Sequence, residues 1–388
     1  MKEIIILGAS GSIGRQTLDV IRNNKDKYKV KGLSLGRDLK LACEILNEFK
    51  VEFAVMRSKE AKDEMEKLFP NIAFSYGEEG LIQLATYDKE NKNILLVVAV
   101  VGSSGLKPTV EAIKIGRNIA LANKETLVTA GEIVMDLAKK NNVTVFPIDS
   151  EHSAIYQSIV GERHEDIKNL IITASGGSFR DYSRESLVNV TKEDALKHPN
   201  WNMGAKITID SSTMMNKGFE VIEAHHLFDI PYENIKTLLH KESIVHSLVE
   251  FKDSSIKAQL GVSDMRIPIL YALSYPERLE YNNELNLINK NLSFSELSSK
   301  RFPCLHMAIE AGKKGNIFPT VLNAANEASV ALFLNDKIAY LDIEKIIEKE
   351  LSLCSPIDNL SLEDILRVDK EIKEKIFKEY GGCELCQY

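Results

Sequence analysis

Short apolar runs alternate with stretches of helical spacing over the first 150 residues. The runs with the length and flanking residues of buried parallel strands are Ile4–Leu7, Val30–Leu35, Phe53–Met56, Leu95–Val101, Ile119–Ala122 and Thr144–Ile148. Between them, Leu39–Phe49 and Pro108–Ile115 carry apolar residues three and four positions apart, which is typical of an amphipathic helix. Strands that alternate with helices predict a doubly wound α/β domain with a parallel sheet.

After Ser150 the pattern changes to that of a mixed α+β domain. The expected strands of its sheet are Leu170–Ala174, Lys206–Asp210 and the alternating stretch Ser243–Val262. Residues 175–205, between the first two, are polar and contain the only tryptophan, Trp201. A connection this long and polar is typical of a functional lid or of a disordered segment.

The last part of the chain has helical spacing. The expected helices are His306–Gly312, Val321–Leu334, Asp342–Leu351 and Ser361–Tyr380. Tyr275–Leu297 has little periodicity and is interpreted as a linker. The predicted α/β protein therefore has an N-terminal domain at 1–149, a central α+β domain at 150–274 with its lid at 175–205, a linker at 275–300 and a small helical domain at 301–388.

Size and charge narrow the classes of protein that fit. A chain of 388 residues is too long for a single core, which agrees with several domains. The net charge of -7 and the pI near 5.8 argue against a nucleic-acid partner, which would need a basic face. No apolar run reaches the roughly 18 residues of a membrane span, and the first residues lack the pattern of a signal peptide. The expected location is the cytoplasm, with no membrane partner.

Cysteine usage indicates little chemistry. The five cysteines are odd in number and scattered, so a disulfide framework is not expected. Cys383 and Cys386 have the C-x-x-C spacing, but one such pair supplies only two of the four ligands of a structural zinc. A metal or redox role for this pair is the less favoured interpretation.

A glycine-rich turn follows the first expected strand. It reads Gly8-Ala9-Ser10-Gly11-Ser12-Ile13-Gly14 and opens a helix that runs through Ile21. Glycines allow a tight turn and let backbone N–H groups approach a pyrophosphate at the positive end of a helix. The strand before it and the helix after it favour a dinucleotide site over a purely structural turn.

The second expected strand ends at Gly36-Arg37-Asp38, where such a domain recognises the adenosine ribose. An acidic residue there favours a free 2′-hydroxyl, whereas an arginine accommodates a 2′-phosphate. This chain has both, side by side. Arg37 favours NADP(H), and Asp38 leaves NAD(H) open.

Charged residues also follow two later strands. Asn123-Lys124-Glu125 lies after Ile119–Ala122, at the sheet edge where open α/β domains bind ligands. Asp149-Ser150-Glu151 lies after the last strand, and an extended chain there would point both carboxylates to one side, as a site for Mg²⁺ or Mn²⁺. The alternatives are a surface turn with a salt bridge for the first group and the N-cap of a helix over His152–Val160 for the second.

The stretch Asp210–Glu220 is dense in polar chemistry. It reads Asp-Ser-Ser-Thr-Met-Met-Asn-Lys-Gly-Phe-Glu. If the chain is helical from about Thr213, then Asn216, Lys217 and Glu220 share one face. Hydroxyl, amide and ammonium groups suit a phosphate, and the glutamate would then serve a metal or a proton. The alternative is a polar helix start with Asp210 or the next residue, Ser211, as N-cap.

Together, these motifs resemble those of the 1-deoxy-D-xylulose 5-phosphate reductoisomerase family, NADPH-dependent enzymes of the non-mevalonate isoprenoid pathway. The likeness runs in order over nearly the whole chain. Besides the stretches above it includes Ala120–Glu125, Asp149–Ser153, Thr173–Gly177, His198–Trp201, Asp264–Arg266 and Asn323–Glu327. The resemblance implies a Rossmann-like first domain, NADPH with Mg²⁺ or Mn²⁺ as cofactors, and a homodimer formed through the Ser243–Val262 region.

The resemblance also implies roles for individual residues. NADPH would contact Ser10, Gly11, Ser12, Ile13, Gly36, Arg37, Asp38, Asn123, Glu125, Gly204 and Met265. The metal ligands would be Asp149, Glu151 and Glu220. The substrate phosphate would contact Ser175, Ser211, Asn216 and Lys217, and the rest of the substrate would meet Lys124, Ser150, Glu151 and Glu220 beneath a lid with His198 and Trp201. The catalytic group would be Lys124, Asp149, Glu151, His198 and Glu220, with Lys124 and a metal-bound water both open as the general acid or base.

A few positions depart from the family pattern. Asp38 stands where the family usually has Asn, Ser178 and Ser263 where it has Pro, and Ser212 where it has Ala. The usual His-Pro-Gln-Ser run is His240-Lys241-Glu242-Ser243. None of these changes removes a proposed ligand or catalytic group.

The resemblance implies rearrangement and reduction of 1-deoxy-D-xylulose 5-phosphate to 2-C-methyl-D-erythritol 4-phosphate. Two other functions fit parts of the sequence. A simple NAD(P)-dependent dehydrogenase of a small phosphorylated substrate would need no metal. A non-catalytic dinucleotide sensor would leave the three carboxylates and the Ser/Asn/Lys cluster unexplained.

Overall fold

The structure is a computed structural model that describes residues 1–201, 203–298 and 300–381, so Cys383 and Cys386 lie outside the described residues. The chain forms two compact units. The first comprises Met1–Thr126, Glu132–Ser153 and Asp264–Asn282, and the second comprises Leu127–Gly131, Ala154–Ser263 and Asn283–Tyr388. The three domains expected from the sequence stay a prediction; by compactness, Asp264–Asn282 belongs with the first sheet and the C-terminal helices belong with the second.

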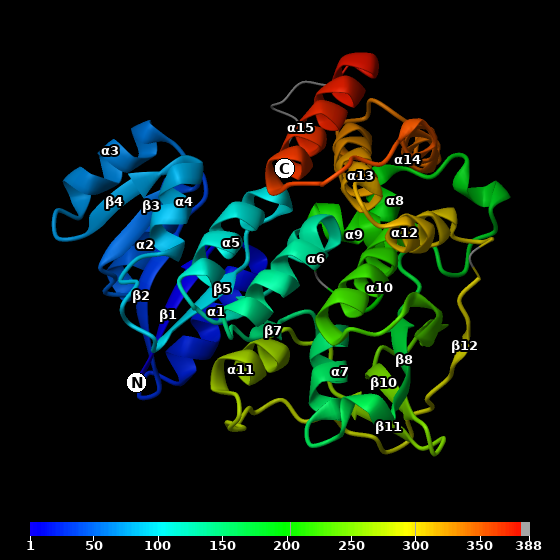
Figure 1. Ribbon diagram of the computed structural model, residues 1–388, viewed down its shortest axis with the longest axis horizontal. Helices are drawn as coiled ribbons and strands as arrows, with labels where there is room; N and C mark the ends of the chain where they lie inside the picture. The colour runs from blue at the N-terminus through cyan, green and yellow to red at the C-terminus, as the bar shows by residue number, and fades with distance from the viewer. Residues whose placement is uncertain (202, 299, 382–388) are drawn as a thin grey trace. The chain divides into compact units, whose positions relative to one another are not determined.

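The first unit is built on a parallel sheet with the strand order β4-β3-β2-β1-β5-β6-β7 (Figure 1). Its strands are β1 Lys2–Leu7, β2 Tyr28–Ser34, β3 Phe53–Met56, β4 Ala73–Tyr76, β5 Ile94–Val98, β6 Ile119–Leu121 and β7 Val145–Pro147. The order reverses beside β1, and ligands of open α/β sheets bind at such a switch point. The doubly wound sheet is confirmed. β4 was missed because this short edge strand is half exposed and lacks a continuous apolar run.

Helices cover both faces of this sheet, which explains why Ile4, Ile5 and Ile6 in β1 are completely buried. The helices are α1 Ser12–Asn23, α2 Leu39–Glu48, α3 Lys59–Leu68, α4 Gly77–Ala85, α5 Leu106–Lys114, α6 Lys124–Lys140 and α11 Arg266–Ser274, with a 3₁₀ turn at Gly102–Gly105. Helix α7, Ser150–Ile159, begins in this unit and continues into the second, where Ile155 is part of the apolar core. Helix α11 packs on α1, where the Arg266 guanidinium donates to Asp19 at 2.5 Å.

The second unit has a mixed sheet with the strand order β11-β10-β8-β9-β12. Its strands are β8 Ile167–Ala174, β9 Ile235–Leu239, β10 Val245–Phe251, β11 Ile256–Leu260 and β12 Ser295–Glu296. β8 and β9 are parallel, and β10 pairs antiparallel with both β8 and β11. The strands expected along Ser243–Val262 are thus an antiparallel hairpin.

The strand expected at Lys206–Asp210 is wrong, because these residues belong to helix α9, Ala205–Thr213. The alternation Lys-Ile-Thr-Ile-Asp imitates a strand. The helix buries nearly its whole circumference, so it lacks the amphipathic period that would have identified it. Two i,i+4 contacts stabilise the helical form: Thr208 Oγ1 donates to the Gly204 carbonyl at 2.8 Å, and Lys206 Nζ lies 3.0 Å from Asp210 Oδ2.

The expected helical tail is confirmed. Its helices are α12 Pro303–Lys314, α13 Phe318–Leu334, α14 Asp342–Leu353 and α15 Leu362–Glu379, and α13 packs against the other three and against α9 (Figure 1). The unit also contains α8 Lys192–Ala195, α10 Met215–Phe228 and 3₁₀ turns at His164–Asp166, Glu185–Leu187 and Tyr232–Asn234. Within the described ranges, no helix has both the length and the apolar character that crossing a membrane requires.

Candidate active site

The glycine-rich turn has no room for side chains at its first and last glycines. Gly8 has φ +91°, and a Cβ there would lie 2.6 Å from the Ala99 carbonyl oxygen. A Cβ on Gly14 would lie 2.1 Å from the Gly8 carbonyl oxygen. Gly11 is the N-cap of α1 and has no side chain to fill the helix terminus. The first N–H groups of α1 are therefore available to an anion such as a pyrophosphate.

At the end of β2, the structure separates the roles of Arg37 and Asp38, which the sequence left open as alternatives. Ser10 Oγ accepts a hydrogen bond from the Gly36 N–H at 2.8 Å, which ties the turn to the end of β2. Asp38 is the N-cap of α2, and its Oδ1 accepts from the Leu41 N–H at 3.0 Å. Arg37 is exposed. Because Asp38 is used as a helix cap, Arg37 is the better placed of the two for a ribose substituent.

The Asn123–Glu125 group is buried, so its interpretation as a surface turn is wrong. Asn123 caps α6 by accepting from the Thr126 N–H at 3.1 Å, and its Nδ2 donates to the carbonyls of Val100 and Gly102. Nδ2 also lies 2.9 Å from Glu125 Oε2. These bonds hold the loop after β5 against the start of α6. They therefore fix the position of Lys124, the first residue of that helix.

Lys124 and Asp149 meet at the carboxyl edge of β6 and β7, with Lys124 Nζ 3.0 Å from Asp149 Oδ2. Helix α7 begins at Ser150, and Asp149 Oδ1 accepts from the Glu151 N–H at 3.1 Å. The N-cap alternative is therefore confirmed and the extended chain is wrong, because the carboxylate satisfies an N–H group of the new helix. Ser150 Oγ donates to Glu151 Oε2 at 2.6 Å.

In the second unit, the polar stretch Asp210–Glu220 forms two helices and not one. Met214, with φ +62°, ends α9, and α10 begins at Met215. The N-cap alternative for Asp210 is wrong, because this residue is buried inside α9. On α10, Asn216 Nδ2 donates to Glu220 Oε1 at 2.5 Å and Lys217 Nζ pairs with Glu220 Oε2. The expected shared face of these side chains is confirmed.

Ser175 follows β8, and the turn after it lies against α9. Gly176 and Gly177 have φ +90° and +66°, and a Cβ on Gly177 would lie 2.4 Å from the Ser211 carbonyl oxygen. Only glycine allows this approach. It brings the Ser175 segment next to the helix that carries Ser211, immediately before the Asn216 and Lys217 turn. Hydroxyl, amide and ammonium donors of this kind suit a phosphate.

His198, in the segment predicted to be a lid, is held in one neutral form. Its Nδ1 accepts from the N–H groups of Asn200 and Trp201 at 3.2 and 3.0 Å, so the proton is on Nε2, which lies 3.1 Å from Ser175 Oγ. Burial, with a smaller contribution from Arg180, lowers the pKa of His198 to about 4. His198 therefore donates to Ser175 at neutral pH, which leaves the serine hydroxyl free to donate to a ligand oxygen.

Two lid contacts were not anticipated. Trp201 Nε1 donates to Ser243 Oγ at 3.1 Å, and Arg180 Nη1 lies 3.2 Å from the Lys241 carbonyl oxygen. Both attach the lid to the β9–β10 connection. Motifs mark some of these residues but not their contacts, because one contact is to a backbone carbonyl and both join segments far apart in the sequence.

The two remaining predicted cofactor residues precede helices. Gly204 is the N-cap of α9, in the second unit, and Met265 is the N-cap of α11, in the first. Met265 lies beside Arg266, whose bonds to Asp19 and Asp264 hold the start of α11. The backbone at both positions is therefore fixed by helices.

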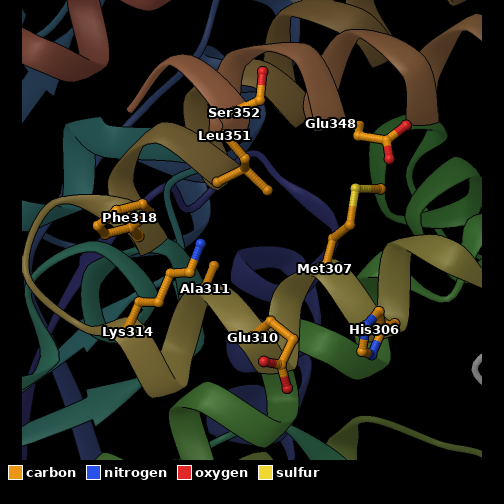
Figure 2. Close-up of a pocket in the computed structure, with 9 residues that line it drawn as sticks. All are labelled: His306, Met307, Glu310, Ala311, Lys314, Phe318, Glu348, Leu351 and Ser352. Carbon is orange, nitrogen blue, oxygen red and sulfur yellow. The ribbon is translucent and has the colours of Figure 1, made fainter. Parts of the chain in front are cut away.

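A pocket of about 200 Å³ lies among the C-terminal helices (Figure 2). Its lining comes from α12, the start of α13 and α14: His306, Met307, Glu310, Ala311, Lys314, Phe318, Glu348, Leu351 and Ser352. Lys314 Nζ lies 4.8 Å from the centre of the Phe318 ring. None of the predicted site residues lines this pocket, so it has no part in the candidate active site.

The sheet with its glycine turn, together with the donor-rich face of the second unit, defines a dinucleotide-dependent oxidoreductase of the α/β class. Family models match successive parts of the chain. The model of 1-deoxy-D-xylulose 5-phosphate reductoisomerase matches residues 4–131, that of its C-terminal domain matches residues 145–228, and that of the DXP reductoisomerase C-terminal domain matches residues 260–375.

Relatives of known name agree. The 1-deoxy-D-xylulose 5-phosphate reductoisomerase of Halalkalibacterium halodurans is 55% identical over 378 residues, which are 96% of this chain and 98% of the relative. The Zymomonas mobilis enzyme in complex with NADPH has a TM-score of 0.90 at 39% identity, over 98% of this chain and 100% of that one. A DOX-P reductoisomerase in complex with NADPH, fosmidomycin and magnesium has a TM-score of 0.92 at 37% identity, over 98% of each chain. This chain belongs to the 1-deoxy-D-xylulose 5-phosphate reductoisomerase family.

Proposed function

We propose that the chain converts 1-deoxy-D-xylulose 5-phosphate to 2-C-methyl-D-erythritol 4-phosphate with NADPH and a divalent metal, as a step of isoprenoid precursor synthesis. The observation that carries this proposal is the single face of α10, where Asn216 and Lys217 lie beside Glu220. This face combines donors for a phosphate with a carboxylate for a cation. A simple dehydrogenase or a sensor has no use for that combination.

The cofactor end fits NADPH. Gly11, Ser12 and Ile13 open α1 and would bind the pyrophosphate through the helix terminus. Ser10 and Gly36 would shape the adenosine side, and Arg37 would bind the 2′-phosphate. Asn123 and Glu125 would support the nicotinamide side from the start of α6, and Gly204 and Met265 would border it.

The carboxylates fit a hard divalent cation. Asp149, Glu151 and Glu220 would bind Mg²⁺ or Mn²⁺, because oxygen-only ligand sets suit these ions. When bound, the ion would polarise the carbonyl and hydroxyl oxygens of the substrate, and the nicotinamide would supply the hydride. Lys124, paired with Asp149, is placed to donate to a substrate oxygen or to move a proton there, and Ser150 would contact the same end of the substrate.

The phosphate end supplies binding energy far from the reacting carbons. Ser175, Ser211, Asn216 and Lys217 would bind the phosphate, and His198 would orient the Ser175 hydroxyl toward it. The lid with His198 and Trp201 would close over the substrate and exclude water while the carbon skeleton rearranges and the resulting aldehyde is reduced. Binding energy gained at the phosphate thereby positions the other end of the substrate.

The proposal includes a homodimer located in the cytoplasm. β11 is an edge strand of its sheet, and Ile256 at its start is 54% exposed. Exposed edge strands pair with other chains unless they are blocked. An Ile256→Lys variant should sediment as a monomer where the parent chain sediments as a dimer, and a parent chain that is monomeric at micromolar concentration refutes the dimer alone.

The test of function is NADPH oxidation with 1-deoxy-D-xylulose 5-phosphate, with and without Mn²⁺, after treatment with EDTA. Metal-dependent oxidation that yields 2-C-methyl-D-erythritol 4-phosphate is the expected result. Oxidation that survives complete metal removal supports a simple dehydrogenase. Tight NADPH binding without turnover supports the sensor.

A further inference from the structure

Asn326 lies in the middle of α13 and holds the helix that carries Ser211. Its Nδ2 donates a hydrogen bond of 2.8 Å to Asp210 Oδ1, and Lys206 Nζ lies 3.0 Å from the other oxygen of the same carboxylate. Asn326 is completely buried, and Asp210 is 2% exposed. Each oxygen of this buried carboxylate thus has its own donor, one from α9 itself and one from α13.

The position of Asp210 makes this bond relevant to the proposed phosphate site. Asp210 immediately precedes Ser211, whose carbonyl oxygen contacts the Gly177 turn after Ser175. Three residues later, the left-handed Met214 joins α9 to the start of α10. A small rotation or slide of α9 would therefore move Ser211 relative to both Ser175 and the Asn216 turn.

A second bond, from the bundle of C-terminal helices α12–α15 and their connections, restrains the same segment. Tyr340, in the connection before α14, donates from its hydroxyl to Ser212 Oγ at 3.1 Å. Asn326 and Tyr340 thus bind the residues on either side of Ser211. The two donors come from different parts of the bundle, so together they restrain both rotation and translation of α9.

We propose that Asn326 is a positioning residue for the substrate phosphate: through Asp210 it sets the register of α9, and so the spacing of the donors on α9, on α10 and at Ser175. The proposal rests on the proposed function, because it takes these donors to bind the phosphate of a sugar-phosphate substrate. It gives the C-terminal helices a role in substrate affinity, although they supply no residue of the proposed site.

The same helix offers a matched control. Asn323 lies one turn earlier on α13 and is also completely buried, but its Nδ2 bonds Glu327 Oε1 at 3.2 Å. Glu327 in turn pairs with Lys373 of α15 at 2.6 Å. Residue type, burial and helix are thus the same, and the two asparagines differ in whether the bonded partner lies on α9.

The experiment compares Asn326→Ala with Asn323→Ala in the full chain. Both variants should lose thermal stability to a similar degree. Asn326→Ala should raise the KM for 1-deoxy-D-xylulose 5-phosphate at least about tenfold, the scale of a lost hydrogen bond to a charged group, and should weaken competition by inorganic phosphate by a similar factor. Its KM for NADPH should stay within about twofold of the parent value, and Asn323→Ala should keep both KM values at that level.

Equal KM values for the sugar phosphate in the two variants overturn the proposal, as does a loss confined to kcat. If Asn326→Ala does not fold, Asn326→Ser makes the same test, because its shorter hydroxyl cannot reach Asp210 and can bond within α13. The parent chain separates this inference from the proposed function. Absence of metal-dependent turnover in the parent refutes the function, whereas parent turnover with unchanged KM in the Asn326 variants refutes only the inference.

Discussion

Glu220→Gln is the substitution with the most sharply defined consequences. It keeps the shape of the side chain and removes the charge that Lys217 neutralises. The side chains of Glu220 and Lys217 are only 1% and 5% exposed. The Asn216 bond to Oε1 can persist with an amide oxygen, so the change is largely electrostatic.

Two magnitudes follow from this burial. Breaking one side of a buried ion pair leaves an uncompensated charge and costs about 3–5 kcal/mol of the free energy of unfolding. Removing both charges together, as in Lys217→Met with Glu220→Gln, is expected to restore most of that loss, because well-packed neutral groups often replace a buried pair at little cost. Metal affinity should not recover in the double variant, since a carboxylate ligand is still missing.

Urea unfolding of the parent, both single variants and the double variant gives the stability cycle, and Mn²⁺ titration by calorimetry gives the metal affinity. NADPH binding should be nearly unchanged in all four proteins, which controls for misfolding. A Glu220→Gln protein that binds Mn²⁺ as tightly as the parent would refute the assignment of this residue as a ligand. A double variant no more stable than Glu220→Gln would refute the electrostatic account of the pair.

Three further results are expected. Gly14→Ala should weaken NADPH binding by about tenfold or more, because the new Cβ would lie 2.1 Å from the Gly8 carbonyl oxygen and would force that carbonyl to move. A fluorescence titration with the cofactor checks this prediction. Arg37→Ala should lose NADPH affinity but leave NADH affinity nearly unchanged, and equal losses contradict a 2′-phosphate contact. The fluorescence of Trp201 should report release of the lid as pH falls from about 6.5 toward 4, because the pKa of His198 is about 4 when docked and near its usual 6.5 when free. The docked state is thus fully stable above this range and weakens below it, and the transition should be absent in His198→Gln.

Much of the first unit could be predicted from the sequence because strands buried on both faces appear as unbroken apolar runs. Ile4–Leu7 and Leu95–Val101 coincide with β1 and β5 within a few residues. β4 escaped because an edge strand is only partly buried. Helix α9 was mistaken for a strand because burial on every side removes the period of 3.6 residues, and its packing partners decide its form.

The candidate site was predictable only as motifs. The glycine turn and the face of α10 follow from local spacing, so short-range rules were sufficient for them. The contact of Gly177 with Ser211 and the bond of Asn326 to Asp210 join segments far apart in the chain. A single sequence contains no signal of such pairings, because any polar group of suitable size would look the same in it. Short-range rules were also insufficient at Asp149, because the sequence Asp149-Ser150-Glu151 fitted both the end of a strand and the cap of a helix.

The Lys217–Glu220 pair has a consequence for the order in which ligands are bound. Without ligands, these two side chains neutralise each other, so the proposed phosphate site carries little net positive charge. In the proposed site, a cation at Glu220 would release the ammonium of Lys217 for the phosphate, and a phosphate at Lys217 would release the carboxylate for the cation. By thermodynamic reciprocity, each ligand then raises the affinity of the other by the same factor. The affinity of a sugar phosphate should therefore rise with metal concentration, and a compound that carries both an anionic group and a metal chelator should gain more than the sum of its two halves.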